Sequence, residues 1–290
     1  MLNIFNPTID APTDASPAWY VTFHDAYCLS QITNAVLVGA LDSLAHVSQP
    51  EVSDGRVRAR RHPSAGIDFA VSTIIAKLHH MPETLKTLAM GMMLDPGDSF
   101  ARNIKIDGPR LLQTTGVENW RAATNGFLNI WEFLFLYSQV EGTLKAILRA
   151  PDDGADGLVN AAFKRDADLA DRLSKRDHVD RNYCARLWKL FTAVRHLCAH
   201  AHGLLTLRTI GDLKELAVPF RKSVDTYFER MSQEDLLTAH VMRIDPQDLF
   251  REERLVEGKF YLLDNLELNV FRHFVCCFMP ELQSLHQSTR

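Results

Sequence analysis

The sequence contains few cysteines, no excess of positive charge and no long apolar run. Five cysteines are an odd number and no two follow the CxxC spacing, so neither a disulfide scaffold nor a cysteine-based zinc site is expected. Lysine and arginine total 32 against 36 aspartate and glutamate residues, which gives a formal net charge of −4. Because proteins that coat nucleic acid non-specifically are strongly basic, we expect any contact with nucleic acid to be local.

Targeting and membrane signals are missing as well. No segment of about 18 residues is apolar and free of charge, as a membrane helix requires. The first residues lack a basic start and are interrupted by Pro7, Pro12 and Pro17, which is not the pattern of a signal peptide. The phosphate-binding loop, the GxSxG motif and the HExxH motif do not occur. We therefore expect a soluble, cytoplasmic protein without membrane contact or cofactor.

Apolar residues recur at helical spacing along most of the chain, and a hydrophobic content of 46% is typical of a folded protein. The pattern predicts an all-α fold with a flexible arm at 1–17, an N-terminal helical domain of unknown role at 18–115, and a helical bundle at 116–290. Trp120 and Trp131 are expected to anchor the long helix of this bundle. The predicted helices cover residues 19–46, 66–79, 82–94, 118–150, 157–174, 181–202, 211–231, 233–241 and 262–285.

A polar stretch from Ser48 to Ser64 interrupts the N-terminal half. It contains four closely spaced arginines, with no aromatic residue between them: Arg56, Arg58, Arg60 and Arg61. A solvated loop is the simple interpretation, and contact with an RNA backbone is the functional one.

The helix predicted at 181–202 has an apolar stripe centred on Val194 and a cationic remainder. The remainder consists of Arg195, His202, His196, Lys189 and His200. At 100° per residue, Arg195 and His200 are about 140° apart, so we expect them to flank one face without touching directly. Gly203 is a favourable residue for ending the helix.

These cationic side chains have three explanations. The helix dipole favours cations in the last turns of any helix. His196 and His200, four residues apart, could chelate a divalent ion, although no acidic or cysteine ligand has a matching local spacing. The third explanation is cleavage of a phosphodiester, because imidazole transfers protons near neutral pH and guanidinium stabilises charge on phosphate. Composition alone does not choose between them.

The segment from Arg195 to His200 has the pattern of an arginine, four residues and a histidine, and it continues as RHLCAHAHG to Gly203. This string resembles the RN-x-CAHH stretch of the abortive-infection branch of the HEPN superfamily. The order of elements is also similar, because a long apolar helix at 131–148 precedes a loop, further helices and the signature helix. The resemblance covers residues 118–290 and has little to say about 1–115.

The resemblance implies a metal-independent endoribonuclease that dimerises through the 181–202 helix. In such enzymes the ribose 2′-OH attacks the adjacent phosphate and leaves a 2′,3′-cyclic phosphate and a 5′-OH. Carried over to this chain, Arg195 stabilises the phosphorane and His200 is the general acid and base. His196 stands where most members have asparagine and could orient the scissile phosphate.

The resemblance also bears on residues around this pair. Lys189 and His202 are expected to contact the substrate. In several toxin members a tyrosine occupies the position of His202, so a modification of that tyrosine does not carry over. Glu141 corresponds to an acidic residue that some members hold near the cleft, and its spacing from Lys145 predicts an ion pair on the exposed side of the long helix.

The biological setting that the resemblance implies is phage defence or toxin activity. RNA, with tRNA as a candidate, is then the target, and an antitoxin or sensor protein is a candidate partner. A second interpretation is a non-catalytic HEPN-like module in which the same helix only forms an interface. His196 in the usual asparagine position favours this alternative.

Overall fold

The structure is a computed structural model that describes residues 8–45, 49–53, 56–60, 108–151, 154–177, 180–201, 203–229 and 250–287. The chain forms two compact units. The larger unit consists of residues 1–34 and 126–290, and the smaller unit consists of residues 35–125. The domain limits expected from the sequence, after residues 17 and 115, stay a prediction.

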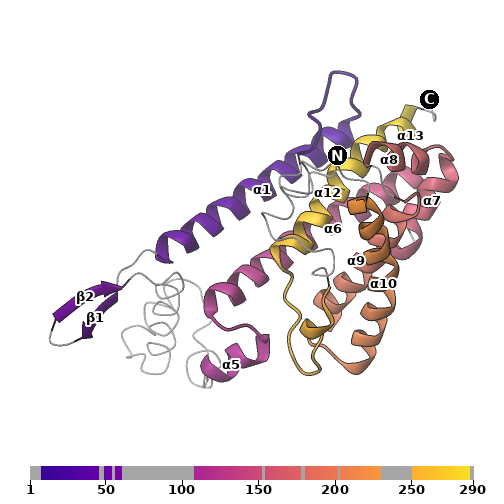
Figure 1. Cartoon of the computed structure of the whole chain (residues 1–290). Coiled ribbons are helices and arrows are strands. Elements are labelled where there is room, and N and C mark those ends of the chain that lie inside the picture. Colours follow the sequence, from indigo (N-terminus) through magenta and orange to yellow (C-terminus); the bar gives the residue numbers. More distant parts are fainter. Residues whose placement is uncertain are drawn as a thin grey trace, which may run out of the picture. The chain divides into compact units, whose positions relative to one another are not determined.

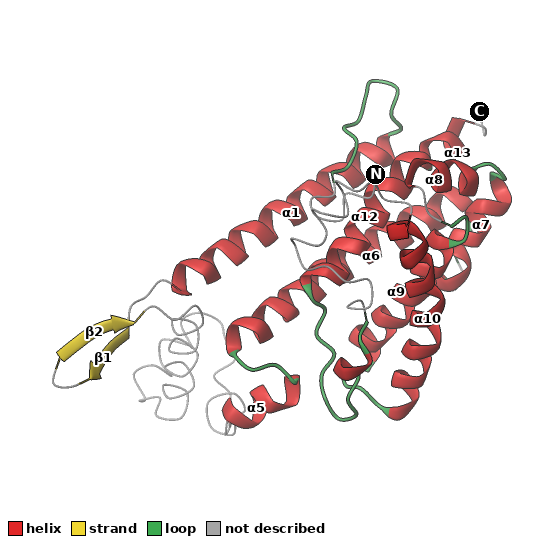
Figure 2. Cartoon of the chain, in the orientation of Figure 1, coloured by secondary structure: helices red, strands yellow, loops and turns green. Residues whose placement is uncertain are grey.

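Helices make up most of the described residues, which confirms the all-α fold class (Figures 1 and 2). Within this part of the chain, none of the helices combines the length and the apolar character of a membrane span. The helices are α1 (Ala18–Ala45), α5 (Gly108–Thr115), α6 (Trp120–Leu148), α7 (Leu158–Arg165), α8 (Leu169–Asp177), α9 (Tyr183–His200), α10 (Leu207–Glu229), α12 (Asn265–Glu281) and α13 (Gln283–Gln287), with short 3-10 turns η1 (Ala155–Gly157) and η3 (Glu252–Arg254).

The helices predicted at 19–46, 118–150 and 181–202 are confirmed as α1, α6 and α9, within two residues at each end. The prediction of one helix at 157–174 is wrong, because α7 ends at Arg165 and α8 begins at Leu169. Asp166 separates them with extended backbone angles, and its carboxylate accepts a hydrogen bond from the backbone N–H of Asp168 at 3.1 Å. Aspartate competes in this way with helical hydrogen bonds.

Two other helices begin or end elsewhere than predicted. Helix α10 begins at Leu207, earlier than the predicted start at 211, because Thr206 and Thr209 cap it. The backbone N–H of Thr209 donates to Thr206 Oγ1 at 3.3 Å, and that of Thr206 donates to Thr209 Oγ1 at 2.9 Å. The helix predicted at 262–285 is α12 followed by α13. The helices predicted at 66–79, 82–94 and 233–241 lie outside the described residues.

The core of the larger unit is an aromatic cluster contributed by α6, α9 and α12. Tyr137 stacks on Trp188 with ring centroids 4.5 Å apart and an interplanar angle of 4°. Phe133 contacts Phe191 and Phe271, with centroids 5.3 and 4.9 Å away. All five side chains are fully buried. Since burial of one such side chain contributes about 1.5–3 kcal/mol, this cluster fixes which face of α9 turns inward.

A buried ionic network ties α1 to α6 and α12 within the larger unit. Glu132 of α6 is 7% exposed and accepts two hydrogen bonds from Arg272 of α12, at 2.6 and 2.5 Å. The same carboxylate accepts hydrogen bonds from Gln31, at 2.6 Å, and from Asn34, both on α1. A buried carboxylate is stable only when it is paired in this way, so the network specifies where α1 lies against the other two helices.

Trp131 does not anchor α6, contrary to the expectation from the sequence. Its side chain is 76% exposed, and Phe127 and Phe135, one turn to either side, are exposed as well. The helix is anchored by its opposite face, where Phe133 and Tyr137 enter the core. Exposed and buried aromatic residues alternate so closely on α6 that composition does not tell them apart.

The smaller unit contains a β-hairpin where the sequence analysis expected a loop. Strands β1 (Gln49–Ser53) and β2 (Arg56–Arg60) pair antiparallel, with Val52 opposite Val57 in the register. The sequence has Asp-Gly at residues 54 and 55, a residue pair that two-residue hairpin turns prefer. This pair is the feature of the sequence that indicates a hairpin. The expected solvated loop at 48–64 is therefore corrected for these ten residues.

Candidate functional site

Helix α9 is held in place by hydrogen bonds on its inner face. The indole N–H of Trp188 donates to the carbonyl oxygen of Ala155 in η1 at 2.7 Å. Thr192 donates to the Trp188 carbonyl oxygen at 2.9 Å, and its hydroxyl lies 2.7 Å from that of Tyr137 on α6. These groups are buried and satisfied, so the helix cannot rotate without breaking them. The residues on its opposite side consequently face solvent.

The end of α9 is fixed by Gly203. This glycine has φ +76°, a conformation that favours glycine, and its N–H donates to the Leu197 carbonyl oxygen at 2.9 Å. Its own carbonyl oxygen accepts a hydrogen bond from Tyr261 at 2.8 Å. His200, the last residue of the helix, is thus held between the helix and a paired loop.

Arg195 and His200 are in direct contact, which corrects the expectation that they do not touch. Nη1 of Arg195 lies 2.8 Å from Nε2 of His200 on the exposed surface. The 140° separation described only the directions of the Cβ atoms, whereas the long arginine side chain spans the turn between them. Because guanidinium only donates, Nε2 of His200 is the acceptor in this contact.

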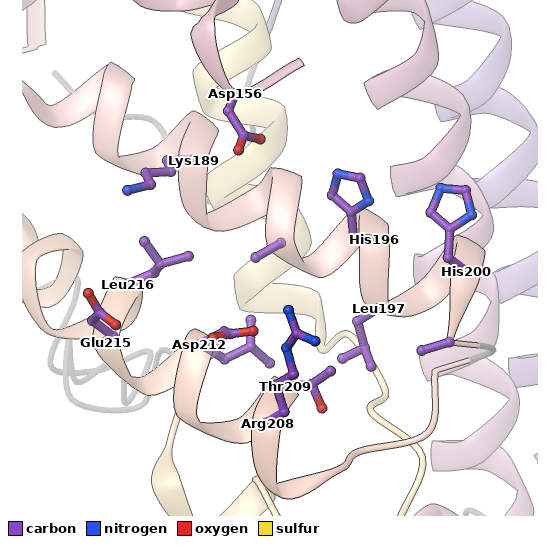
Figure 3. Close-up of a pocket in the computed structure, with 13 residues that line it drawn as sticks. Asp156, Lys189, His196, Leu197, His200, Arg208, Thr209, Asp212, Glu215 and Leu216 are labelled. Carbon is purple, nitrogen blue, oxygen red and sulfur yellow. The ribbon is translucent and has the colours of Figure 1, made fainter. Parts of the chain in front are cut away.

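His196 lies one turn before His200 on the same side of α9 (Figure 3). The two imidazole rings are 5.4 Å apart between centroids and tilted by 34°. Both side chains are exposed, and Arg195 is half-buried. The structure therefore brings the three residues assigned to catalysis together at one accessible place.

A pocket of about 670 Å³ lies between α9 and α10. From α9 it is lined by Lys189, His196 and His200, and Figure 3 shows Arg208 extending from α10 toward α9. Lys189 therefore shares a pocket with two of the catalytic candidates, and its expected contact with the substrate stays a prediction. The remaining lining residues are Asp156, Ala193, Leu197, Ala201, Thr209, Asp212, Leu213, Glu215 and Leu216.

A second pocket, of about 710 Å³, lies on the other side of His196, between α6, η1, α7 and α9. Arg195 and His196 line it, together with Lys164 and the ion pair of Glu141 and Lys145. This pair is confirmed at 3.0 Å, but its side chains are only 17% and 28% exposed, so they belong to a pocket wall and not to an open helix face. His196 and Asp156 line both pockets.

The thiol inside the signature is not activated. Burial raises the pKa of Cys198 to about 12, so the thiol is protonated at neutral pH. Cys276 and Cys277 lie buried in α12. A thiolate is therefore not available among these residues at neutral pH.

His202, the other expected substrate contact, lies outside the described residues. Among the residues that the structure does describe, no three histidine, cysteine or acidic side chains gather where they could hold one metal ion. His196 and His200 thus form a two-histidine pair within that part of the chain.

Sequence reasoning missed the groups that complete the two pockets. Asp156 lies in a 3-10 turn, within a segment whose sequence is typical of a loop. The other charged groups come from the first turns of α10 and are Arg208, Asp212 and Glu215. A helical pattern shows which residues share a face of α10. Only the packing of α10 against α9 shows that this face turns to the signature residues.

Comparisons of this chain with protein-family models, with curated proteins and with solved structures found no match.

Proposed function

We propose that this chain is a metal-independent endoribonuclease of the HEPN type, which cleaves RNA by attack of the ribose 2′-OH on the neighbouring phosphate. One observation carries the proposal: the hydrogen bond of 2.8 Å between Arg195 and His200 on an accessible helix face. This contact supports the proposal because a charge stabiliser and a proton acceptor that lie so close together can act on one phosphodiester.

The contact with Arg195 suits His200 to begin the reaction. Nε2 of His200 accepts the hydrogen bond from the guanidinium, and an imidazole nitrogen that can accept a proton is what a general base requires. Guanidinium has five N–H donors, so Arg195 can turn its hydrogen bonds toward a phosphate and leave Nε2 free. Binding of the substrate phosphate by Arg195 thus frees Nε2 of His200 to take up a proton.

The chemical step balances with these groups alone. Nε2 of His200 takes the proton of the 2′-OH, the O2′–P bond forms, and Arg195 stabilises the negative charge that gathers on the phosphorane. The P–O5′ bond then breaks, and the proton is returned to O5′, which leaves a 2′,3′-cyclic phosphate and a 5′-OH. His196, with its ring 5.4 Å from that of His200, donates to a non-bridging oxygen and orients the phosphate.

The setting of this activity is part of the proposal. We place it in the cytoplasm, in phage defence or as a toxin, with two copies of the chain joined along α9 and an antitoxin or sensor as a regulator. Leu204 and Leu207, which directly follow α9, are 41% and 70% exposed and supply apolar surface for that contact. Sedimentation of the purified protein tests the homodimer.

The test of the nuclease is incubation of the purified protein with total cellular RNA and with tRNA in the presence of EDTA, followed by mapping of the product ends. We expect cleavage that leaves cyclic phosphates. We expect His200→Ala and Arg195→Ala each to reduce the rate of cleavage at least about 100-fold, because the loss of a general acid–base group or of a group that stabilises an oxyanion has an effect of this size. Arg181→Ala is the matched control, because Arg181 is exposed just before α9 and lines neither pocket.

Cleavage that persists in His200→Ala, or that needs a metal ion, contradicts the proposal. Intact RNA together with growth inhibition that Arg195→Ala does not relieve favours the non-catalytic module. A nuclease needs this arginine, whereas an interface at α9 tolerates its loss.

A further inference from the structure

The two pockets beside His196 have opposite charge. The pocket between α9 and α10 contains three carboxylates and two cationic side chains: Asp156, Asp212, Glu215, Lys189 and Arg208. The pocket on the α6 side reverses this balance, with three cationic side chains and two carboxylates: Lys145, Lys164, Arg195, Glu141 and Asp156. A phosphodiester backbone is attracted to the cationic pocket and repelled from the acidic one. The acidic pocket is therefore suited to another part of a nucleotide.

The wall of the acidic pocket contains larger apolar side chains than that of the cationic pocket. Leu197 of α9 and Leu213 and Leu216 of α10 line it, together with Ala193 and Ala201. Besides its charged residues and His196, the cationic pocket is lined by glycine, alanine and asparagine and by no leucine. Apolar side chains in a pocket wall pack against the face of a nucleobase, which leaves the base edges free to meet polar groups.

Three charged side chains of α10 can form hydrogen bonds with a ligand. Arg208, Asp212 and Glu215 lie within two turns of one another at exposed positions. No described residue forms an ion pair or a side-chain hydrogen bond with any of the three. They present, side by side on one helix, a guanidinium that only donates and two carboxylates that only accept.

We infer that the pocket between α9 and α10 binds a guanine base that flanks the scissile phosphate. Guanine offers two adjacent donors, N1–H and N2–H, to a carboxylate, and two acceptors, O6 and N7, to a guanidinium. Uracil, cytosine and adenine have neither of these two pairs. Asp212 and Glu215 thus read the donor edge, and Arg208 reads the acceptor edge. The inference rests on the proposed function, since it places this base next to the Arg195–His200 pair.

Binding of mononucleotides tests the pocket without any cleavage. The purified protein is titrated calorimetrically with the 3′-monophosphates of guanosine, adenosine, cytidine and uridine. We expect the guanosine nucleotide to bind at least about 10-fold more tightly than the others, because one bidentate contact gives about that discrimination. Arg208→Ala and Asp212→Asn each abolish this preference, and Glu215→Gln weakens it. All three residues are exposed, and thermal unfolding confirms that the variants are folded.

Glu229→Gln is the matched control, because Glu229 is exposed on the same helix and lies outside the pocket. Equal affinity for the four nucleotides, or a guanosine preference that survives both Arg208→Ala and Asp212→Asn, overturns the inference.

Cleavage of short RNAs that contain a single guanosine separates this inference from the proposed function. Cleavage at the guanosine that becomes indiscriminate in Asp212→Asn supports both. Cleavage that depends on Arg195 and His200 but ignores the base supports the nuclease and overturns the guanine site. Guanosine binding without any cleavage supports the pocket and counts against the nuclease.

Discussion

At the scale of single residues, the contact between Arg195 and His200 marks the limit of reasoning from sequence. The signature residues could be named from the sequence, and a helical wheel gave the direction of each side chain where it leaves the backbone. It did not give the place where a long side chain ends, and this is why the 2.8 Å contact was missed. Conversely, Trp131 has the residue type of an anchor but lies on the solvent side of α6.

His273 of α12 provides a residue-scale prediction about pH. It is 3% exposed, and burial lowers its pKa to about 3, so the folded protein holds it neutral. The unfolded chain takes up a proton below about pH 6.5, and the folded chain does not, so the free energy of unfolding falls as the pH falls from there toward 3. We expect the wild type to lose about 2 kcal/mol more than His273→Gln between pH 7 and pH 5.

Urea denaturation of both proteins at the two pH values measures this difference. Parallel losses in the wild type and in His273→Gln would show that the acid sensitivity comes from other groups.

At the scale of elements, the sequence predicted where long helices lie better than where they begin and end. Periodicity located α1, α6 and α9 because apolar residues recur at helical spacing along each of them. The break at Asp166 and the early start of α10 at Thr206 depend on single side chains that bond to the backbone. A side chain that bonds to the backbone competes with the hydrogen bonds of a further helical turn, and the two are close in free energy. Composition alone therefore does not predict where such a helix begins or ends.

Two glycines of α6 give an element-scale prediction with its own control. A Cβ at Gly126 would lie 2.8 Å from Cβ of Leu262, whereas a Cβ at Gly142 would meet nothing within 4 Å. Alanine in a helix is favoured over glycine by about 0.5–1 kcal/mol, and we expect Gly142→Ala to gain that amount. Gly126→Ala should instead lose about 1–3 kcal/mol, because the backbone must move away from Leu262.

Chemical denaturation of the two variants measures these changes in the free energy of unfolding. A stabilising Gly126→Ala would mean that α6 and the loop at Leu262 are not in close contact in solution.

At the scale of the whole molecule, the sequence predicted the all-α class and the position of the signature helix, but not which surface faces it. The acidic pocket needs α10 opposite α9, and the cationic pocket needs η1 and α7 beside α6. Both depend on the packing of segments far apart in the chain. A single sequence contains no signal for such pairings beyond the requirement that apolar faces be buried.

The network around Glu132 gives a prediction at the same scale. Replacing Glu132 by alanine leaves Arg272 without its buried partner and breaks the bonds to Gln31 and Asn34. Loss of one partner of a buried pair costs about 3–5 kcal/mol, and it should release α1 before the rest of the larger unit unfolds. Limited proteolysis followed by mass spectrometry should then show early cuts within α1.

Glu118→Ala serves as the control, because Glu118 is exposed and should leave the pattern of cuts unchanged. A Glu132→Ala protein that is digested like the wild type would show that α1 is held by its apolar contacts alone.

The aromatic cluster has a consequence for the order in which the protein is made. Phe271 of α12 completes the core into which α6 and α9 pack, and Arg272 next to it holds Glu132. A ribosome makes the residues of α6 and α9 well before those of α12. Until α12 has emerged, the aromatic rings of α6 and α9 lack their contacts with Phe271. A cell that makes this protein therefore meets the completed core beside the Arg195–His200 site only after α12 has been made.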